Sequence, residues 1–225
     1  MSIAAVTIAS MTNAALPARQ ARSRESVERL VQATVSILDK EGLAGATIPR
    51  IAARAGLAAG TVYRRFPDKD ALLREVCLRL VEQNGRVQDA WLNPDRWRKS
   101  TLKELCQSLV AMLLKSHAEH HRLILSLGLF ATQDSDAGFV KKIHRLQQES
   151  LKRLAQLLLT RRQEIRHPDP EAAVYFALLS VLMTVQGVYV LPTMARPFRA
   201  LLPDVDARLR KELPVMLLRY LGIEQ

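Results

Sequence analysis

The feature that most constrains the fold of this chain is a 26-residue stretch, 47–72, in which two short amphipathic segments flank Gly56. Glycine adopts a positive φ without steric cost, so Gly56 allows a sharp turn between the two segments. The apolar positions around this turn recur at helical spacing: Ile51, Ala52, Ala55, Leu57, Val62 and Phe66. We therefore expect short helices at 47–56 and 59–65 that cross closely, as in a helix-turn-helix.

The face opposite Val62 and Phe66 is expected to be exposed, and it carries groups that suit the major groove of DNA. An arginine can pair with guanine or bind a phosphate, and a threonine can contact a thymine methyl group. Thr47 and Lys69 stand where helices are predicted to begin, and helix N-termini favour phosphate groups. The predicted DNA contacts are Thr47, Arg50, Gly60, Thr61, Tyr63, Arg64, Arg65 and Lys69.

In this stretch the sequence resembles the tetracycline-repressor (TetR) family of bacterial regulators. The matching residues are Thr47, Ile51, Ala52, Ala55, Gly56, Gly60, Thr61, Tyr63, Phe66, Lys69 and Leu72. The resemblance implies a three-helix DNA-binding domain followed by a linking helix, together covering about residues 22–90. The sequence departs from the family at Ala58 and Ala59, where Ser or Thr followed by a polar residue is frequent. The missing helix cap should cost about 1 kcal/mol and leave more of the DNA affinity to Arg64 and Arg65.

The whole chain has the composition of an all-α protein. Only 9 of its 225 residues are glycine, 48% are hydrophobic, and no segment shows the alternation of a strand. Helices are predicted at 23–41, 47–56, 59–65, 68–90, 98–117, 119–132, 136–163, 170–191 and 206–221. The predicted domains are a disordered leader (1–21), a helix-turn-helix DNA-binding domain (22–68), a linking helix (69–90) and an effector-binding and dimerisation domain (91–225).

From Ala172 to Leu191 the chain carries no charged residue, so a helix here is apolar on every side and should be buried on every side. Small residues recur along one face and permit close approach of another helix. Together with two leucines of the last helix they form the predicted dimer interface: Ala173, Ala177, Ser180, Thr184, Gly187, Leu213 and Leu217. The segment also has the length and apolarity of a transmembrane helix. Gln186 and the upstream helix-turn-helix favour a soluble homodimer without a membrane partner.

The resemblance also implies that a small-molecule effector binds the C-terminal domain and changes the spacing of the two DNA-binding heads. Side chains that can line its pocket, or equally fill an ordinary core, are Met112, Phe130, Phe139, Phe176 and Met183. Few polar residues occur in these helices, which favours an apolar or aromatic effector. His117, His120 and His121 have spacing that suits a metal, but no cysteine or carboxylate pattern completes a site. We expect no metal and no cofactor.

The formal net charge of +11 indicates a polyanionic partner, either nucleic acid or an acidic membrane surface. Arg19, Arg22 and Arg24 of the leader region fit a minor-groove arm or solvated disorder equally well. No basic segment precedes the apolar leader, which argues against a secretory signal. Cys77 and Cys106 lie inside helical patterns and do not indicate a disulfide, as is usual in the cytoplasm.

The sequence shows no nucleophile–base pair, glycine-rich phosphate loop or paired carboxylates that would indicate an enzyme. We therefore predict a cytoplasmic, sequence-specific DNA-binding transcription regulator that acts as a homodimer on a palindromic operator in double-stranded DNA. The resemblance further implies a repressor that is released by a small-molecule effector. The alternative is a helical membrane-associated or interaction protein that uses 172–191 as its anchor or interface.

Overall fold

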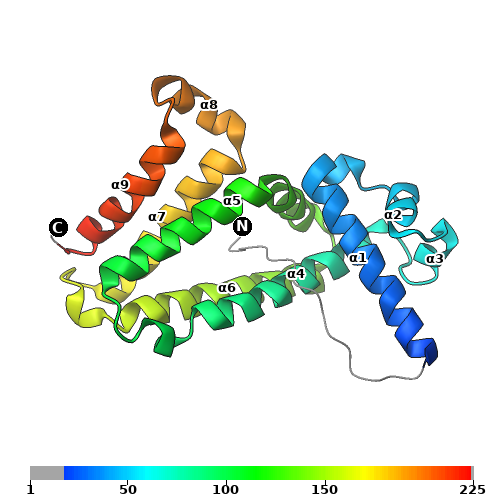
Figure 1. Ribbon diagram of the computed structural model, residues 1–225, viewed down its shortest axis with the longest axis horizontal. Coiled ribbons are helices and arrows are strands. Elements are labelled where there is room, and N and C mark those ends of the chain that lie inside the picture. The colour runs from blue at the N-terminus through cyan, green and yellow to red at the C-terminus, as the bar shows by residue number, and fades with distance from the viewer. Residues whose placement is uncertain (1–17, 224–225) are drawn as a thin grey trace. The chain divides into compact units, whose positions relative to one another are not determined.

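The computed structural model describes residues 18–223, apart from the side chains of residues 18–22, 86, 87, 192 and 194 (Figure 1). Every regular element in this range is helical, which confirms the all-α prediction. The elements are α1 (Ala18–Gly45), α2 (Ile48–Ala55), α3 (Ala59–Tyr63), α4 (Lys69–Trp91), η1 (Pro94–Trp97), α5 (Leu102–Gln133), α6 (Ala137–Leu159), η2 (Arg162–Glu164), α7 (Pro170–Tyr189), α8 (Pro192–Leu201) and α9 (Val205–Tyr220).

The helices differ from the sequence prediction in three main ways. The helices expected at 98–117 and 119–132 are one helix, α5, which bends at His120 (φ −126°, ψ 26°). Helix α8 was not predicted; Pro192 lies in its first turn, where the missing N–H has no helical partner to lose. Helix α1 begins at Ala18, so residues 18–21 of the predicted leader are helical, and residues 1–17 lie outside the described range.

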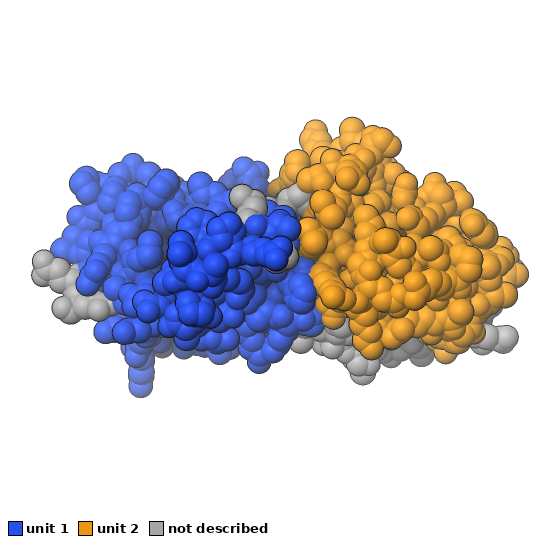
Figure 2. All heavy atoms as spheres, turned by 90° about the horizontal axis from the view of Figure 1, so that it is seen from above, with its two compact units in different colours: residues 1–5, 85–121, 145–225 blue, residues 6–84, 122–144 orange. Residues whose placement is uncertain are grey.

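The chain folds into two compact units, shown in different colours in Figure 2. In the described range, unit 2 comprises residues 18–84 and 122–144, and unit 1 comprises residues 85–121 and 145–223. The predicted domains were consecutive segments of the chain. They did not include the return of 122–144 to unit 2, because packing between segments far apart in sequence leaves no local pattern.

A bidentate ion pair joins two distant segments within unit 2. Arg74 of α4 donates to both carboxylate oxygens of Asp134, which follows α5, over 2.8 and 2.9 Å. Burial raises the pKa of Asp134, but the hydrogen bonds from Arg74 and from the backbone N–H of Asp136 outweigh it and leave this pKa below its usual range. Because the Asp134 side chain is only 1% exposed, removing Arg74 would leave a buried, uncompensated charge.

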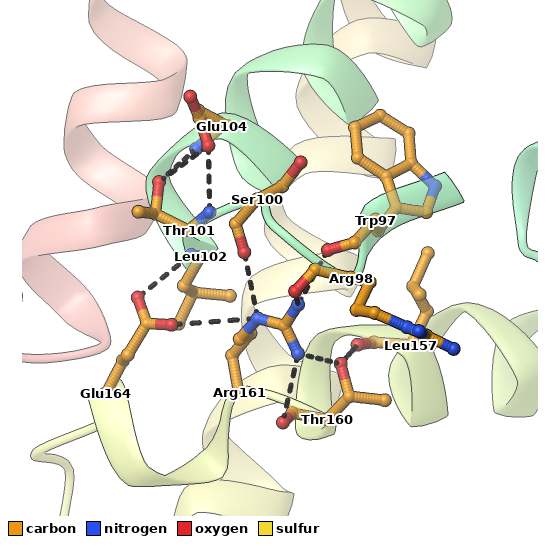
Figure 3. A network of polar contacts seen from close by, with 10 residues as sticks. All are labelled: Trp97, Arg98, Ser100, Thr101, Leu102, Glu104, Leu157, Thr160, Arg161 and Glu164. Atoms are coloured by element: carbon orange, nitrogen blue, oxygen red, sulfur yellow. Dashed lines mark hydrogen bonds and ion pairs between the residues drawn. The ribbon is translucent and has the colours of Figure 1, made fainter. Parts of the chain in front are cut away.

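The core of unit 1 is formed mainly by leucines of α5 and α6 and by the inner side of α7. Arg161, just beyond α6, holds the turn that precedes α5 (Figure 3). Its guanidinium donates to the carbonyl oxygens of Ser100 (2.9 Å), Trp97 (2.6 Å) and Arg98 (3.1 Å). Since backbone carbonyls at the end of a short helix need hydrogen-bond donors, this side chain fixes η1 and the start of α5.

Helix α5 also begins with a reciprocal cap, visible in Figure 3. The backbone N–H of Thr101 donates to Glu104 Oε2 (2.8 Å), and the N–H of Glu104 donates to Thr101 Oγ1 (3.3 Å). This pairing is a capping box, which satisfies two backbone donors that have no partner inside the helix.

Candidate nucleic-acid interface

The inward side of the α2–turn–α3 segment is arranged as its apolar pattern predicts. The buried side chains there are Ile51, Ala52, Ala55, Val62 and Phe66, with Leu57 partly buried. Gly56 has the left-handed conformation that the turn requires (φ 63°, ψ 39°). Because both helices are anchored by this shared core, the outer side of α3 is held in one orientation.

Arg29 of α1 supports the turn, and sequence reasoning did not identify it. Its Nη2 donates to the carbonyl oxygen of Gly56 over 3.1 Å. A Cβ at position 56 would lie 2.7 Å from that same nitrogen and would displace the end of the Arg29 side chain, but it is the positive φ that requires glycine. The two residues are 27 positions apart, and no local pattern could have paired them.

The outer side of α3, here called the recognition face, consists of Gly60, Thr61, Tyr63 and Arg64. Tyr63 is 58% exposed, Gly60 and Arg64 are exposed, and Thr61 is partly buried. Arg64 Nη2 donates to Thr61 Oγ1 over 3.0 Å, which restrains the guanidinium. A Cβ at Gly60 would contact nothing within 4 Å, so packing inside the protein does not require glycine there. A close approach by an external partner would require it.

The helix N-termini around this face differ in how they are capped. Thr47 occupies the N-cap position of α2 and Ala58 that of α3, and neither side chain caps its helix. The missing cap on α3 agrees with the prediction made from Ala58. At α4, in contrast, Asp68 Oδ1 accepts from the backbone N–H of Ala71 (2.7 Å), so a carboxylate stands next to Lys69. A phosphate is therefore less favoured beside Lys69 than at the other two helix starts.

Two of the predicted phosphate-binding arginines have partners inside unit 2. Arg50 forms an ion pair with Glu41 of α1, and Arg65 donates to the hydroxyl of Ser23 at the start of α1. Both arginines are exposed, so each can still reach a phosphate after exchanging its partner. Arg64 differs, because its hydrogen-bond partner, Thr61, is itself part of the recognition face.

The five side chains predicted to line an effector pocket are divided between the two units. Phe130 and Phe139 pack on each other in unit 2, with ring centroids 5.9 Å apart. Met112 packs against the core of unit 1, whereas Phe176 and Met183 are exposed on α7. A shared residue type does not by itself place side chains together, so a single pocket lined by all five stays a prediction.

Four of the seven residues of the predicted dimer interface lie inside the protomer, which contradicts that part of the prediction. Ala173, Ala177, Leu213 and Leu217 are buried within the protomer and leave no surface for a partner. Ser180 and Thr184 are exposed and Gly187 is partly buried. The small-residue stripe therefore runs along the border between the buried and the exposed side of α7.

A large apolar surface instead lies on the outer sides of α7 and α9. This surface, called the α7–α9 face, consists of Tyr175, Phe176, Leu179, Met183, Met216 and Tyr220, all exposed. The two helices are in contact, and the rings of Phe176 and Tyr220 lie 5.3 Å apart. An exposed apolar patch that extends over two helices is typical of a protein–protein or membrane contact.

Helix α7 is the one described helix long and apolar enough to cross a membrane, with 39% of its most apolar window buried inside the protein. The three histidines considered for a metal are separated by the bend in α5: His117 is buried, His120 is partly buried and His121 is exposed. Within residues 18–223, no group of three or more His, Cys, Asp or Glu side chains is arranged to hold a metal ion.

A known protein family and several curated relatives match the part of the chain that carries this interface. Residues 30–76 match the family described as bacterial regulatory proteins, tetR family. The HTH-type transcriptional regulator BetI of Paraburkholderia phytofirmans is 39% identical over 72 residues, which are 32% of this chain and 34% of that regulator. The HTH-type transcriptional repressor DrrR1 of Streptomyces coeruleorubidus is 30% identical over 96 residues, 43% of this chain and 34% of that repressor. The matched part thus spans about a third of the length of these curated relatives.

Solved structures resemble nearly the whole chain. A transcriptional regulator from Rhodococcus sp. Rha1 has a TM-score of 0.61 and 20% identity, covering 86% of this chain and 96% of its own. The regulator FadR from Bacillus subtilis, in complex with stearoyl-CoA, has a TM-score of 0.57 and 21% identity, covering 88% and 99%. At these identities the likeness establishes a common fold.

Proposed function

We propose that this chain, whose residues 30–76 match the tetR family of bacterial regulatory proteins, is a DNA-binding transcription regulator that recognises a palindromic operator as a homodimer. It acts in the cytoplasm as a repressor, without catalytic activity of its own, and a small molecule bound by the C-terminal region releases it from DNA. The curated relatives, named as transcriptional regulators and a repressor, support this assignment.

The observation that carries the proposal is the recognition face. A five-residue helix, anchored by Val62 and Phe66, presents Tyr63 and Arg64 to solvent next to a glycine that has no packing partner. Arginine and tyrosine at this position can bind base edges and phosphates in a major groove. We propose that Thr61, Tyr63 and Arg64 contact bases and that Thr47, Arg50, Gly60, Arg65 and Lys69 approach the backbone.

The α7–α9 face supports the proposal of a homodimer. A twofold arrangement would bury this apolar surface against its copy and would place two recognition faces on one duplex. We propose that Phe176, Leu179 and Met183, with Ser180 and Thr184 at their edge, form the contact. This assignment replaces the buried residues predicted from the small-residue stripe.

The test is selection of binding sites from random duplexes, followed by measurement of affinity for the selected sequence. Tyr63→Ala should abolish sequence-specific binding while the thermal unfolding curve and the dimer remain unchanged, because Tyr63 is exposed. Arg145→Ala, which removes an exposed cation of α6, is the control and should bind normally. Equal affinity of the wild type for every duplex would overturn the proposal.

The membrane alternative rests on the length and apolarity of α7. The buried side chains of α7, such as Val174, Leu178 and Val181, belong to the core of unit 1, and this packing favours a helix of a folded domain. Fractionation decides between the two functions. The proposed regulator remains in the supernatant without detergent, and a membrane protein does not.

A further inference from the structure

His117 is a buried polar residue that the proposed function has not used. It lies on α5 in unit 1 and is 0% exposed. Its Nδ1 lies 2.8 Å from the carbonyl oxygen of Leu113, one turn earlier on the same helix. Because a carbonyl oxygen can only accept, Nδ1 carries the hydrogen, and Nε2 of the neutral ring is an acceptor. Burial lowers the pKa of His117, although the bond to Leu113 opposes this, and the neutral form is favoured.

The acceptor Nε2 has no partner among the residues that the structure describes. Its neighbours on the preceding turn, Leu113 and Leu114, are themselves buried in the apolar core of unit 1. A buried acceptor without a donor is destabilising, and folded proteins rarely leave one without a reason. A ligand that supplies the missing donor would remove this cost on binding.

The backbone near His117 is also irregular. At His120, three residues later, α5 leaves helical geometry (φ −126°, ψ 26°), and the helix enters unit 2 at residue 122. A helix bends sharply where a side chain or another group interrupts its hydrogen-bond ladder. The unpartnered nitrogen thus lies one turn before a bend, on a helix that contributes to both units.

We propose that His117 Nε2 accepts a hydrogen bond from the effector, which is an otherwise apolar molecule bearing one O–H or N–H donor, such as a phenol, an alcohol or an amide. An ether of the same shape has no hydrogen to donate to Nε2. A carboxylate anion has only acceptor atoms, so it cannot donate to Nε2 either. Both should be rejected, since a site built to form a hydrogen bond discriminates strongly against analogues that cannot form it. This inference rests on the proposed regulation by a small molecule.

The experiment uses matched probes on the full chain: phenol, anisole and benzoate, and the larger set 1-naphthol, 1-methoxynaphthalene and 1-naphthoate. Binding is followed by calorimetry and by the ¹⁵N resonances of the histidine rings. We expect the free protein to show His117 protonated at Nδ1 only. A phenolic probe should shift the Nε2 resonance and bind about tenfold or more tightly than its methyl ether or carboxylate.

The variant His117→Phe should bind phenol and anisole, or naphthol and its ether, equally. His144→Phe, at an exposed histidine of α6, is the control and should retain the preference. If His117→Phe does not fold, the wild-type ring spectrum and the probe series still decide. Protonation at Nε2, equal affinity for phenol and ether, a water as the partner that no probe displaces, or absence of binding by both phenolic probes would each overturn the inference.

The two proposals fail separately. DNA binding without any response of His117 to the probes would remove only the assignment of His117. If a phenolic probe binds His117 but the protein binds no specific duplex, the proposed regulator function fails and the proposed binding site stands.

Discussion

The recognition face and the α7–α9 face both expose aromatic side chains, but their surroundings differ. Tyr63 is exposed on the same recognition face as Arg64, whose guanidinium donates to the hydroxyl of Thr61. Phe176 and Leu179 lie on a helix that has no charge between Ala172 and Leu191. Cations among polar groups can bind the phosphates of a hydrated polyanion. An uncharged apolar surface instead stabilises a complex only when a partner covers it. The same residue classes therefore indicate DNA on one unit and a protein partner on the other.

The largest expected effect comes from placing a charge in the α7–α9 face. Leu179→Glu should weaken dimerisation by about 3 kcal/mol or more, because each copy would bury an unpaired carboxylate. Sedimentation should then show a monomer, and specific DNA binding should fall with it. Gln156→Glu, at an exposed position of α6, is the control and should leave the dimer intact. A Leu179→Glu variant that remains dimeric would place the interface elsewhere.

A smaller effect is expected from removing the cation of the recognition face. Arg64→Ala should cost about 1–3 kcal/mol of affinity for the operator and leave the dimer unchanged. If Arg64 contacts a phosphate, the slope of log affinity against log salt should also fall by about one. If it pairs with guanine, discrimination at one base pair should be lost instead. Unchanged affinity, with unchanged discrimination, would exclude Arg64 from the interface.

The smallest expected effect comes from restoring a cap to α3. Ala58 has the extended backbone of an N-cap residue (φ −72°, ψ 145°), so in Ala58→Ser the hydroxyl can accept from a backbone N–H of the first turn. The free energy of unfolding should rise by about 0.5–1 kcal/mol, measured by denaturant titration. Ala53→Ser, at an exposed position inside α2, is the control and should not stabilise the protein. Equal responses of both variants would refute the capping argument.

The two faces also differ in how far the sequence predicted them. In the α2–turn–α3 segment, polar and apolar residues alternate at helical spacing, so the pattern identified the buried side chains correctly. On α7 every side is apolar or small, and periodicity gave no inward direction. The prediction therefore placed Ala173 and Ala177 at the partner, whereas they pack inside the protomer.

The amino-acid sequence alone determined the helical class, the glycine turn and the side of α3 that faces solvent, because each depends on residues within a few helical turns of one another. Tertiary structure alone decided that Arg29 supports Gly56, that residues 122–144 join unit 2 and that α7 exposes Phe176 and Leu179. These features arise from packing between segments far apart in the chain. Local spacing contains no information about which distant surface a helix will meet.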